Sequence, residues 1–149
     1  MIRRKPEGLI LILEDSDEDF DTALEALAKT GISYGVRRAK TGDECLMLIK
    51  ESGGEVLHPA LILLDLNTPG LDGRDALREI KADAKLKELP VVVFSTSGNQ
   101  RDLELCYRHG ANAYHVKPVK YPDYLGRMQQ VFTYWLGCVV LPLCQEVPQ

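Results

Sequence analysis

The sequence predicts an α/β protein in which five parallel strands form one sheet, doubly wound, with five helices covering its two faces. One observation is that short apolar segments alternate along the chain with longer segments of helical periodicity. A second is that residues 61–64 and 91–94 are unbroken apolar runs, as expected of strands buried on both faces. The alternation implies right-handed crossovers between parallel neighbours.

The first half of the chain predicts two strands, each followed by a helix. Residues 8–13 form an apolar strand that stops at Glu14, and Ser16 can cap the helix that follows. Gly31 ends that helix, and residues 32–39 alternate weakly, as in a strand near the edge of a sheet. Thr41 and Glu44 have the spacing of a capping box for the next helix, which should end at the glycines of residues 52–54.

The second half of the chain predicts three strands and three helices. Asp72 can cap a helix after the strand 61–64, and a helix of about residues 99–109 follows the strand 91–94. Residues 113–116 form a last short strand. The final helix has the clearest periodicity, and its apolar positions are Tyr121, Tyr124, Leu125, Met128, Val131, Phe132, Trp135 and Leu136. Gly137 is expected to end it.

Length and composition indicate a single domain over residues 1–149, with a core of about 8–136 and a tail of 137–149 that packs or makes a dimer contact. The formal net charge of −4 argues against a general nucleic-acid binder, and no apolar run is long enough to cross a membrane. The cysteines form no CxxC pair, so we expect reduced thiols and a cytoplasmic protein.

Polar residues stand where the predicted strands end. Glu14 and Asp15 follow the first strand, Asp65 the third, Ser95 the fourth and Lys117 the fifth. Carboxyl ends of parallel strands lie along one edge of the sheet. In the flavodoxin-like strand order 2-1-3-4-5 the first and third strands are neighbours at the topological switch point. The three carboxylates are therefore expected in one crevice.

Three close carboxylates repel one another, and a hard divalent cation with oxygen ligands relieves that repulsion. Mg²⁺ is the usual cation where a phosphate group is also present. Lys117 offers an ammonium and Ser95 a hydroxyl, both suited to phosphoryl oxygens. Metal, carboxylate, hydroxyl and ammonium together favour phosphoryl transfer onto Asp65 itself.

These motifs resemble those of response-regulator receiver domains: Glu14-Asp15, Asp65 within Asp-Leu-Asn-Thr-Pro-Gly-Leu-Asp-Gly, Ser95, and Lys117-Pro118, in the same order and spacing. The resemblance covers roughly residues 8–136. It implies that Asp65 accepts a phosphoryl group from a sensor histidine kinase. Carried over residue by residue, it implies Mg²⁺ ligands at Glu14, Asp15, Asp65 and the backbone carbonyl of Asn67, phosphoryl contacts from Ser95 and Lys117, a cis Lys117–Pro118 bond, and a switch formed by Ser95 and Tyr114.

The end of the chain shows a narrower resemblance, to the small stand-alone response regulators of cyanobacterial phytochromes. It rests on residues 95–97, Cys106-Tyr107, residues 110–112 and the tail from Phe132 to Pro142. The resemblance implies a phytochrome as the sensor kinase and a homodimer. The apolar surplus of the last helix and tail suggests dimer contacts at Tyr134, Trp135, Val139 and Leu141. Packing of the tail onto its own chain is the alternative.

Other interpretations of the same residues stay open. A flavodoxin-like cofactor binder would need a phosphate loop after the first strand, where this chain has carboxylates instead. An aspartyl-phosphate hydrolase would carry a second acid two residues after the nucleophile, where Asn67 stands. Tyr114 could be packing alone. The acids of residues 17–19 are expected mainly to complement the dipole of their helix.

Overall fold

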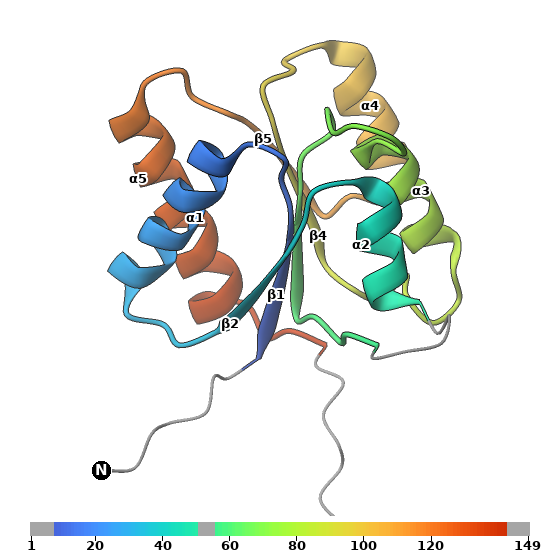
Figure 1. The fold of residues 1–149 in the computed structure, drawn as a ribbon, viewed down its shortest axis with the longest axis horizontal. Helices are drawn as coiled ribbons and strands as arrows, with labels where there is room; N and C mark the ends of the chain where they lie inside the picture. The colour runs from blue at the N-terminus through green and yellow to red at the C-terminus, as the bar shows by residue number, and fades with distance from the viewer. Residues whose placement is uncertain (1–7, 51–55, 143–149) are drawn as a thin grey trace, which may run out of the picture.

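Five parallel strands form one sheet in the order β2-β1-β3-β4-β5 in the computed structural model, which describes residues 8–50 and 56–142. This is the predicted fold class (Figure 1). The strands are β1 (Leu9–Leu13), β2 (Gly35–Ala39), β3 (Leu61–Leu64), β4 (Val91–Ser95) and β5 (Ala113–Val116). The helices are α1 (Asp17–Thr30), α2 (Gly42–Ile49), α3 (Gly73–Ala82), α4 (Gln100–Arg108) and α5 (Tyr121–Phe132).

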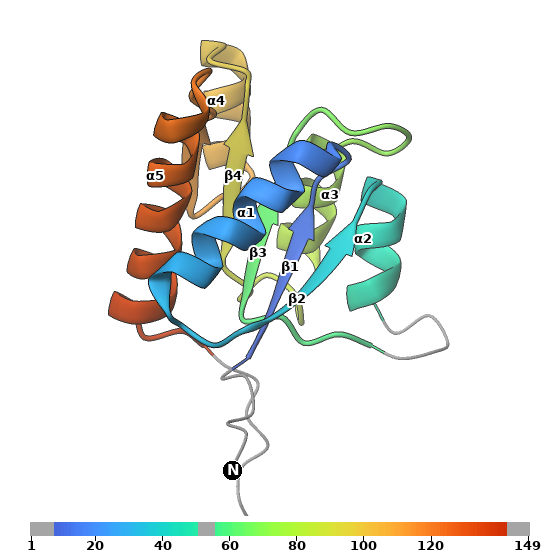
Figure 2. The same ribbon diagram turned by 60° about the vertical axis from the view of Figure 1, so that its left-hand side comes forward.

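The helices cover the two faces of the sheet separately. Figures 1 and 2 show α1 and α5 together on one face and α2, α3 and α4 on the other. Because strand side chains alternate between faces, β3 sends Leu61 and Leu63 into the core under α1 and α5, and Ile62 and Leu64 into the opposite core. Every residue of β3 is buried, as its unbroken apolar sequence predicts.

Local capping places the helix starts where the sequence predicts them. The Ser16 hydroxyl accepts a hydrogen bond from the Asp19 amide at 3.2 Å, and the Thr41 hydroxyl accepts one from the Glu44 amide at 3.1 Å. The carboxylate of Asp72 accepts hydrogen bonds from the amides of Arg74 and Asp75. Gly31 ends α1 in the left-handed conformation, with φ of 73°.

The end of the last helix differs from the prediction. The α-helix stops at Phe132, and the chain continues as a π-helical segment, η1 (Thr133–Cys138), closed by a hydrogen bond from the Val139 amide to the Tyr134 carbonyl at 2.9 Å. The wider turn is not visible in a helical pattern of apolar residues, because both helix types keep one side turned to the core. The predicted glycine stop after α2 lies outside the described residues.

Among residues 8–50 and 56–142, no helix has the length and apolar character needed to span a bilayer. Within the same ranges the cysteines are free thiols: Cys45 and Cys106 are buried and Cys138 is exposed. Burial raises the pKa of Cys45 to about 12 and that of Cys106 to about 11, so both stay protonated and act as small apolar groups.

Candidate phosphoacceptor site

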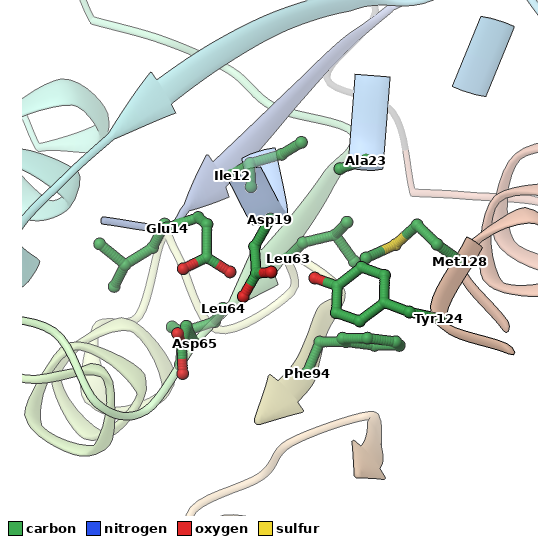
Figure 3. A pocket seen from close by; sticks show the side chains of 11 residues that line it. Ile12, Glu14, Asp19, Ala23, Leu63, Leu64, Asp65, Phe94, Tyr124 and Met128 are labelled. Carbon is green, nitrogen blue, oxygen red and sulfur yellow. The ribbon is translucent and has the colours of Figure 1, made fainter. Parts of the chain in front are cut away.

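Three carboxylates meet at the carboxyl edge of the sheet. Strands β1 and β3 pair in parallel with Leu13 beside Leu64, so the residues that follow each strand emerge side by side. Carboxylate oxygens of Glu14, Asp15 and Asp65 all lie within 4.8 Å of one another. Figure 3 shows Glu14 and Asp65 at the ends of their strands, around a small cavity. The prediction that these acids share one crevice is confirmed.

The ammonium of Lys117 lies among the carboxylates. Its Nζ donates to Glu14 Oε1 at 2.6 Å and to Asp65 Oδ2 at 3.1 Å. The side chains of Lys117 and Glu14 are only 5% and 6% exposed. Lys117 follows β5 at the far end of the sheet, but its long side chain crosses the end of β4 to reach Asp65. The structure therefore brings Lys117 and Asp65 together, as predicted.

Burial and neighbouring charges shift the pKa values of Glu14 and Lys117. Burial raises the pKa of Glu14 to about 7, against the opposing effect of the Lys117 ammonium, and the Asp65 carboxylate adds to the rise. Burial by itself would lower the pKa of Lys117, but the surrounding carboxylates outweigh it and raise that pKa above its usual value. Lys117 is therefore a fixed positive charge at neutral pH.

The donor set suits a hard divalent cation. One ammonium serves a cluster of carboxylates, so the site keeps an excess of negative charge beside the carboxylate of Asp15. Carboxylate oxygens from three residues match the ligands that Mg²⁺ and Mn²⁺ take in proteins. The amide of Asn67 donates to Asp65 Oδ1 at 3.2 Å, which helps to orient this carboxylate.

The predicted switch residues are linked through the loop after β4. Ser95 is fully buried, and its hydroxyl oxygen accepts a hydrogen bond from the Ser97 amide at 3.2 Å. The Tyr114 hydroxyl donates to the Ser97 carbonyl at 2.7 Å. Burial raises the pKa of this phenol, so it remains a donor. Ser95 and Tyr114 therefore contact the same loop residue.

Two groups of residues around the site were not anticipated from the sequence. Asp19, expected to serve only the helix dipole, accepts a hydrogen bond from Lys117 Nζ at 2.8 Å. The available signal was the position of Asp19 in the first turn of α1, four residues after Asp15, which places it near the carboxylate cluster. Arg74 on α3 forms a bidentate pair with Asp102 on α4, at 2.7 and 2.8 Å. The Ser97 hydroxyl also donates to Asp102, at 2.6 Å, so the Arg74–Asp102 pair holds the loop after β4 in place.

Replacing Asp102 with asparagine is expected to destabilise the fold by about 1–2 kcal/mol near neutral pH, because a charge-assisted bidentate pair is lost. The hydrogen bond from Arg74 lowers the pKa of Asp102 from 3.8 to about 2. A carboxylate with a lowered folded-state pKa stabilises the fold above its unfolded pKa, and that contribution is lost as pH falls through the folded value. In urea denaturation the difference between variant and parent should therefore shrink between pH 3.8 and about 2.

Glu104→Gln on the same helix is the matched control for Asp102→Asn, since Glu104 accepts an exposed hydrogen bond from Gln100, one turn away on α4. It should change the free energy of unfolding by less than about 0.5 kcal/mol. A loss of stability in Asp102→Asn that did not vary with pH would contradict a contribution from the ion pair.

One expectation of the resemblance is wrong in this structure. The Lys117–Pro118 bond is trans, and no cis peptide bond occurs in residues 8–50 and 56–142. The trans isomer is the more stable before proline by about 0.5–1 kcal/mol, and Lys117 reaches Glu14 and Asp65 from it.

The strand order is 2-1-3-4-5, and a carboxylate cluster lies at the switch point between β1 and β3, in contact with the Lys117 ammonium. A buried serine, Ser95, ends the neighbouring strand β4. These features define the receiver class of α/β domain. A family model described as the response regulator receiver domain matches residues 10–129. The chain belongs to this family, and so to the proteins of two-component signal transduction.

The chain is also similar to individual response regulators. It is 35% identical to the response regulator Rcp1 of Synechocystis sp. over 139 residues, which cover 92% of this chain and 95% of Rcp1. The solved structure of the Mn²⁺-bound form of Rcp1 matches with a TM-score of 0.87 and 35% identity, over 91% of this chain and 99% of that one. The phosphorylated cyanobacterial phytochrome response regulator RcpA matches with a TM-score of 0.83 and 34% identity, over 91% and 98%.

Proposed function

We propose that Asp65 accepts a phosphoryl group from the phosphohistidine of a sensor histidine kinase. The observation that carries the proposal is the position of Lys117, whose ammonium lies 3.1 Å from Asp65 inside a cluster of carboxylates. In the reaction an Asp65 oxygen bonds to phosphorus while the bond from phosphorus to the histidine nitrogen breaks. Lys117 and the Ser95 hydroxyl then stabilise the charge on the phosphoryl oxygens.

The resident cation in this proposal is Mg²⁺, held by Glu14, Asp15, Asp65 and the backbone carbonyl of Asn67. When bound, it neutralises phosphoryl charge and orients the acceptor carboxylate. The chain thus assists its own phosphorylation and dephosphorylation and is not an enzyme for a separate substrate. The grouping of Glu14, Asp15 and Asp65 supports the metal requirement, because three carboxylates without a bound cation would repel an incoming phosphoryl donor.

Incubation with acetyl phosphate tests both parts of the proposal. The protein should gain the mass of one phosphoryl group when Mg²⁺ is present and none when the metal is removed with EDTA, as measured by intact-mass spectrometry. Equal labelling with and without Mg²⁺ would argue against the metal site, and no labelling under either condition would argue against the acceptor.

Phosphorylation is proposed to act on the face formed by Ser95 and Tyr114. A phosphoryl oxygen that accepts a hydrogen bond from the Ser95 hydroxyl would draw this hydroxyl toward Asp65 and with it the loop that also holds the Tyr114 hydroxyl through Ser97. The similarity to the cyanobacterial phytochrome response regulator RcpA supports a phytochrome as the kinase. We propose a cytoplasmic single-domain protein that acts through protein partners rather than nucleic acid.

We further propose that the end of α5, η1 and the tail form a homodimer contact. Tyr134 and Val140 are exposed, whereas Trp135 and Leu141 pack partly against the core under α1 and α5. The described part of the tail therefore covers its own chain and still presents apolar surface. Val139, also named from the sequence as a contact, is half-buried.

The protein is expected to sediment and scatter light as a dimer at high concentration, and Tyr134→Arg should shift it toward monomer by placing a charge in the contact. Met47→Arg is the control, because Met47 is an exposed apolar residue on α2, on the other face of the sheet. A parent protein that stays monomeric, phosphorylated or not, would refute the dimer.

A further inference from the structure

Lys117 has no free hydrogen-bond donor in this structure. An ammonium carries three N–H bonds, and they go to Glu14 at 2.6 Å, Asp19 at 2.8 Å and Asp65 at 3.1 Å. A phosphoryl group on Asp65 extends beyond the carboxylate, away from the sheet, and Lys117 must turn toward it to neutralise it. At least one of the present contacts is then weakened.

Asp19 is the partner that the ammonium loses at the lowest cost. The side chain of Glu14 is 6% exposed, so little water can replace the ammonium beside it. Asp19 is 33% exposed, so water can replace part of what it loses. Its backbone is held in the first turn of α1 by the Ser16 cap, so Asp19 cannot readily follow Lys117. Asp19 therefore competes with the phosphoryl group for the ammonium.

Tyr124 supplies the replacement partner. Its side chain is 7% exposed, yet its hydroxyl has no hydrogen bond within the described part of the chain. Tyr124 and Asp19 line the same small cavity of about 10 Å³, which holds at most one water molecule. Figure 3 shows the Tyr124 hydroxyl directed toward the Asp19 carboxylate. Burial raises the pKa of this phenol, so it stays protonated and can donate to a carboxylate.

We propose that Asp19 and Tyr124 are positioning residues for Lys117. In the unphosphorylated protein, the Asp19 carboxylate binds the Lys117 ammonium and keeps it from turning outward. When Lys117 turns to the phosphoryl group, the Tyr124 hydroxyl donates a hydrogen bond to Asp19 instead, directly or through one water. The pair then sets how firmly the site retains the phosphoryl group. This inference rests on the proposed function of Asp65.

Fluoroberyllate, a phosphoryl mimic, allows the proposal to be tested at equilibrium by calorimetric titration of the full chain in Mg²⁺. Asp19→Asn should bind it roughly fivefold more tightly than the parent, because the competitor for Lys117 is removed. Tyr124→Phe should bind it roughly fivefold more weakly, because Asp19 is left without a partner. In the double variant the phenylalanine should have no effect, since no carboxylate remains for the hydroxyl to serve.

Asp21→Asn is the matched control for charge, because Asp21 is an exposed acid on the same helix and makes the same change in net charge away from Lys117. Thermal unfolding without fluoroberyllate distinguishes a positioning role from a structural one. If the two residues had a structural role, the effects of Asp19→Asn and Tyr124→Phe on the melting temperature would also depend on each other. The proposal would be overturned by weaker binding in Asp19→Asn, or by an effect of Tyr124→Phe that is equal in the parent and in the Asp19→Asn background. Failure of the parent protein to bind fluoroberyllate would instead refute the function of Asp65.

Discussion

Asparagine in place of Asp65 is expected to abolish uptake of a phosphoryl group from acetyl phosphate, the largest functional effect of any single substitution in this chain. The amide keeps the shape of the carboxylate and an oxygen that Lys117 can contact, but it lacks the negative charge that attacks phosphorus. Intact-mass spectrometry of parent and variant in Mg²⁺ measures the result. Loss of the nucleophile leaves no labelling above background.

Asp21→Asn controls for the change of net charge in the Asp65 experiment and should be labelled like the parent, because Asp21 is exposed on α1. Stabilisation by Mg²⁺ gives a second measurement, since a ligand that binds the folded state raises the melting temperature. Mg²⁺ should stabilise Asp65→Asn less than the parent, because one anionic ligand is lost. An undiminished gain of mass in Asp65→Asn would place the phosphoryl group on another residue.

Alanine in place of Gly73 is expected to have the largest effect on stability. A Cβ at this position would overlap the backbone carbonyl oxygen of Asp65, and it would lie 2.8 Å from the carbonyl carbon of Asp65 and from Leu64 Cδ2. A backbone carbonyl cannot rotate away as a flexible side chain can, so β3 and the start of α3 must separate. We expect a loss of about 3 kcal/mol or more in the free energy of unfolding, measured by urea denaturation.

The same overlap links Gly73 to the proposed function, because the carbonyl that must move belongs to Asp65, the proposed acceptor. Any Gly73→Ala protein that folds should therefore be phosphorylated more slowly than the parent. Gly126→Ala in α5 is the matched control: nothing lies within 4 Å of its Cβ, and alanine in a helix interior should stabilise the protein by about 0.5–1 kcal/mol. A Gly73→Ala protein as stable as the parent would show that β3 and α3 pack less closely in solution than in this structure.

Much of the site could be predicted because it depends on strand ends rather than on side-chain detail. An unbroken apolar run ending at Asp65 predicts a buried parallel strand, and parallel strands bring their carboxyl ends to one edge whatever the loops do. The first strand therefore had to bring Glu14 and Asp15 close to Asp65 once the strand order was correct. Helix starts were equally predictable, since capping at Ser16, Thr41 and Asp72 involves residues within a few positions of one another.

The contacts that could not be predicted join distant residues through particular rotamers. Lys117 and Asp19 are 98 positions apart, and Arg74 and Asp102 are 28 apart. The periodicity of α1 shows only that Asp19 lies in its first turn. Whether Asp19 meets Lys117 depends on how α1 packs beside α5 and on the path from β5 to α5. The change to π-helical turns at Thr133 likewise leaves no signal in the spacing of the apolar residues.

By itself, then, the sequence determined the order of strands and helices and the grouping of Asp65 with the carboxylates beside it, because apolar periodicity fixes which residues are buried and parallel pairing fixes which edge they share. Only the tertiary structure decided which partners Lys117 takes and how the Arg74–Asp102 pair holds the loop after β4. It also decided that the Tyr124 hydroxyl is directed toward the Asp19 carboxylate. These contacts depend on how side chains from distant segments pack and pair their charges in the folded interior. Local sequence patterns carry no information about that packing.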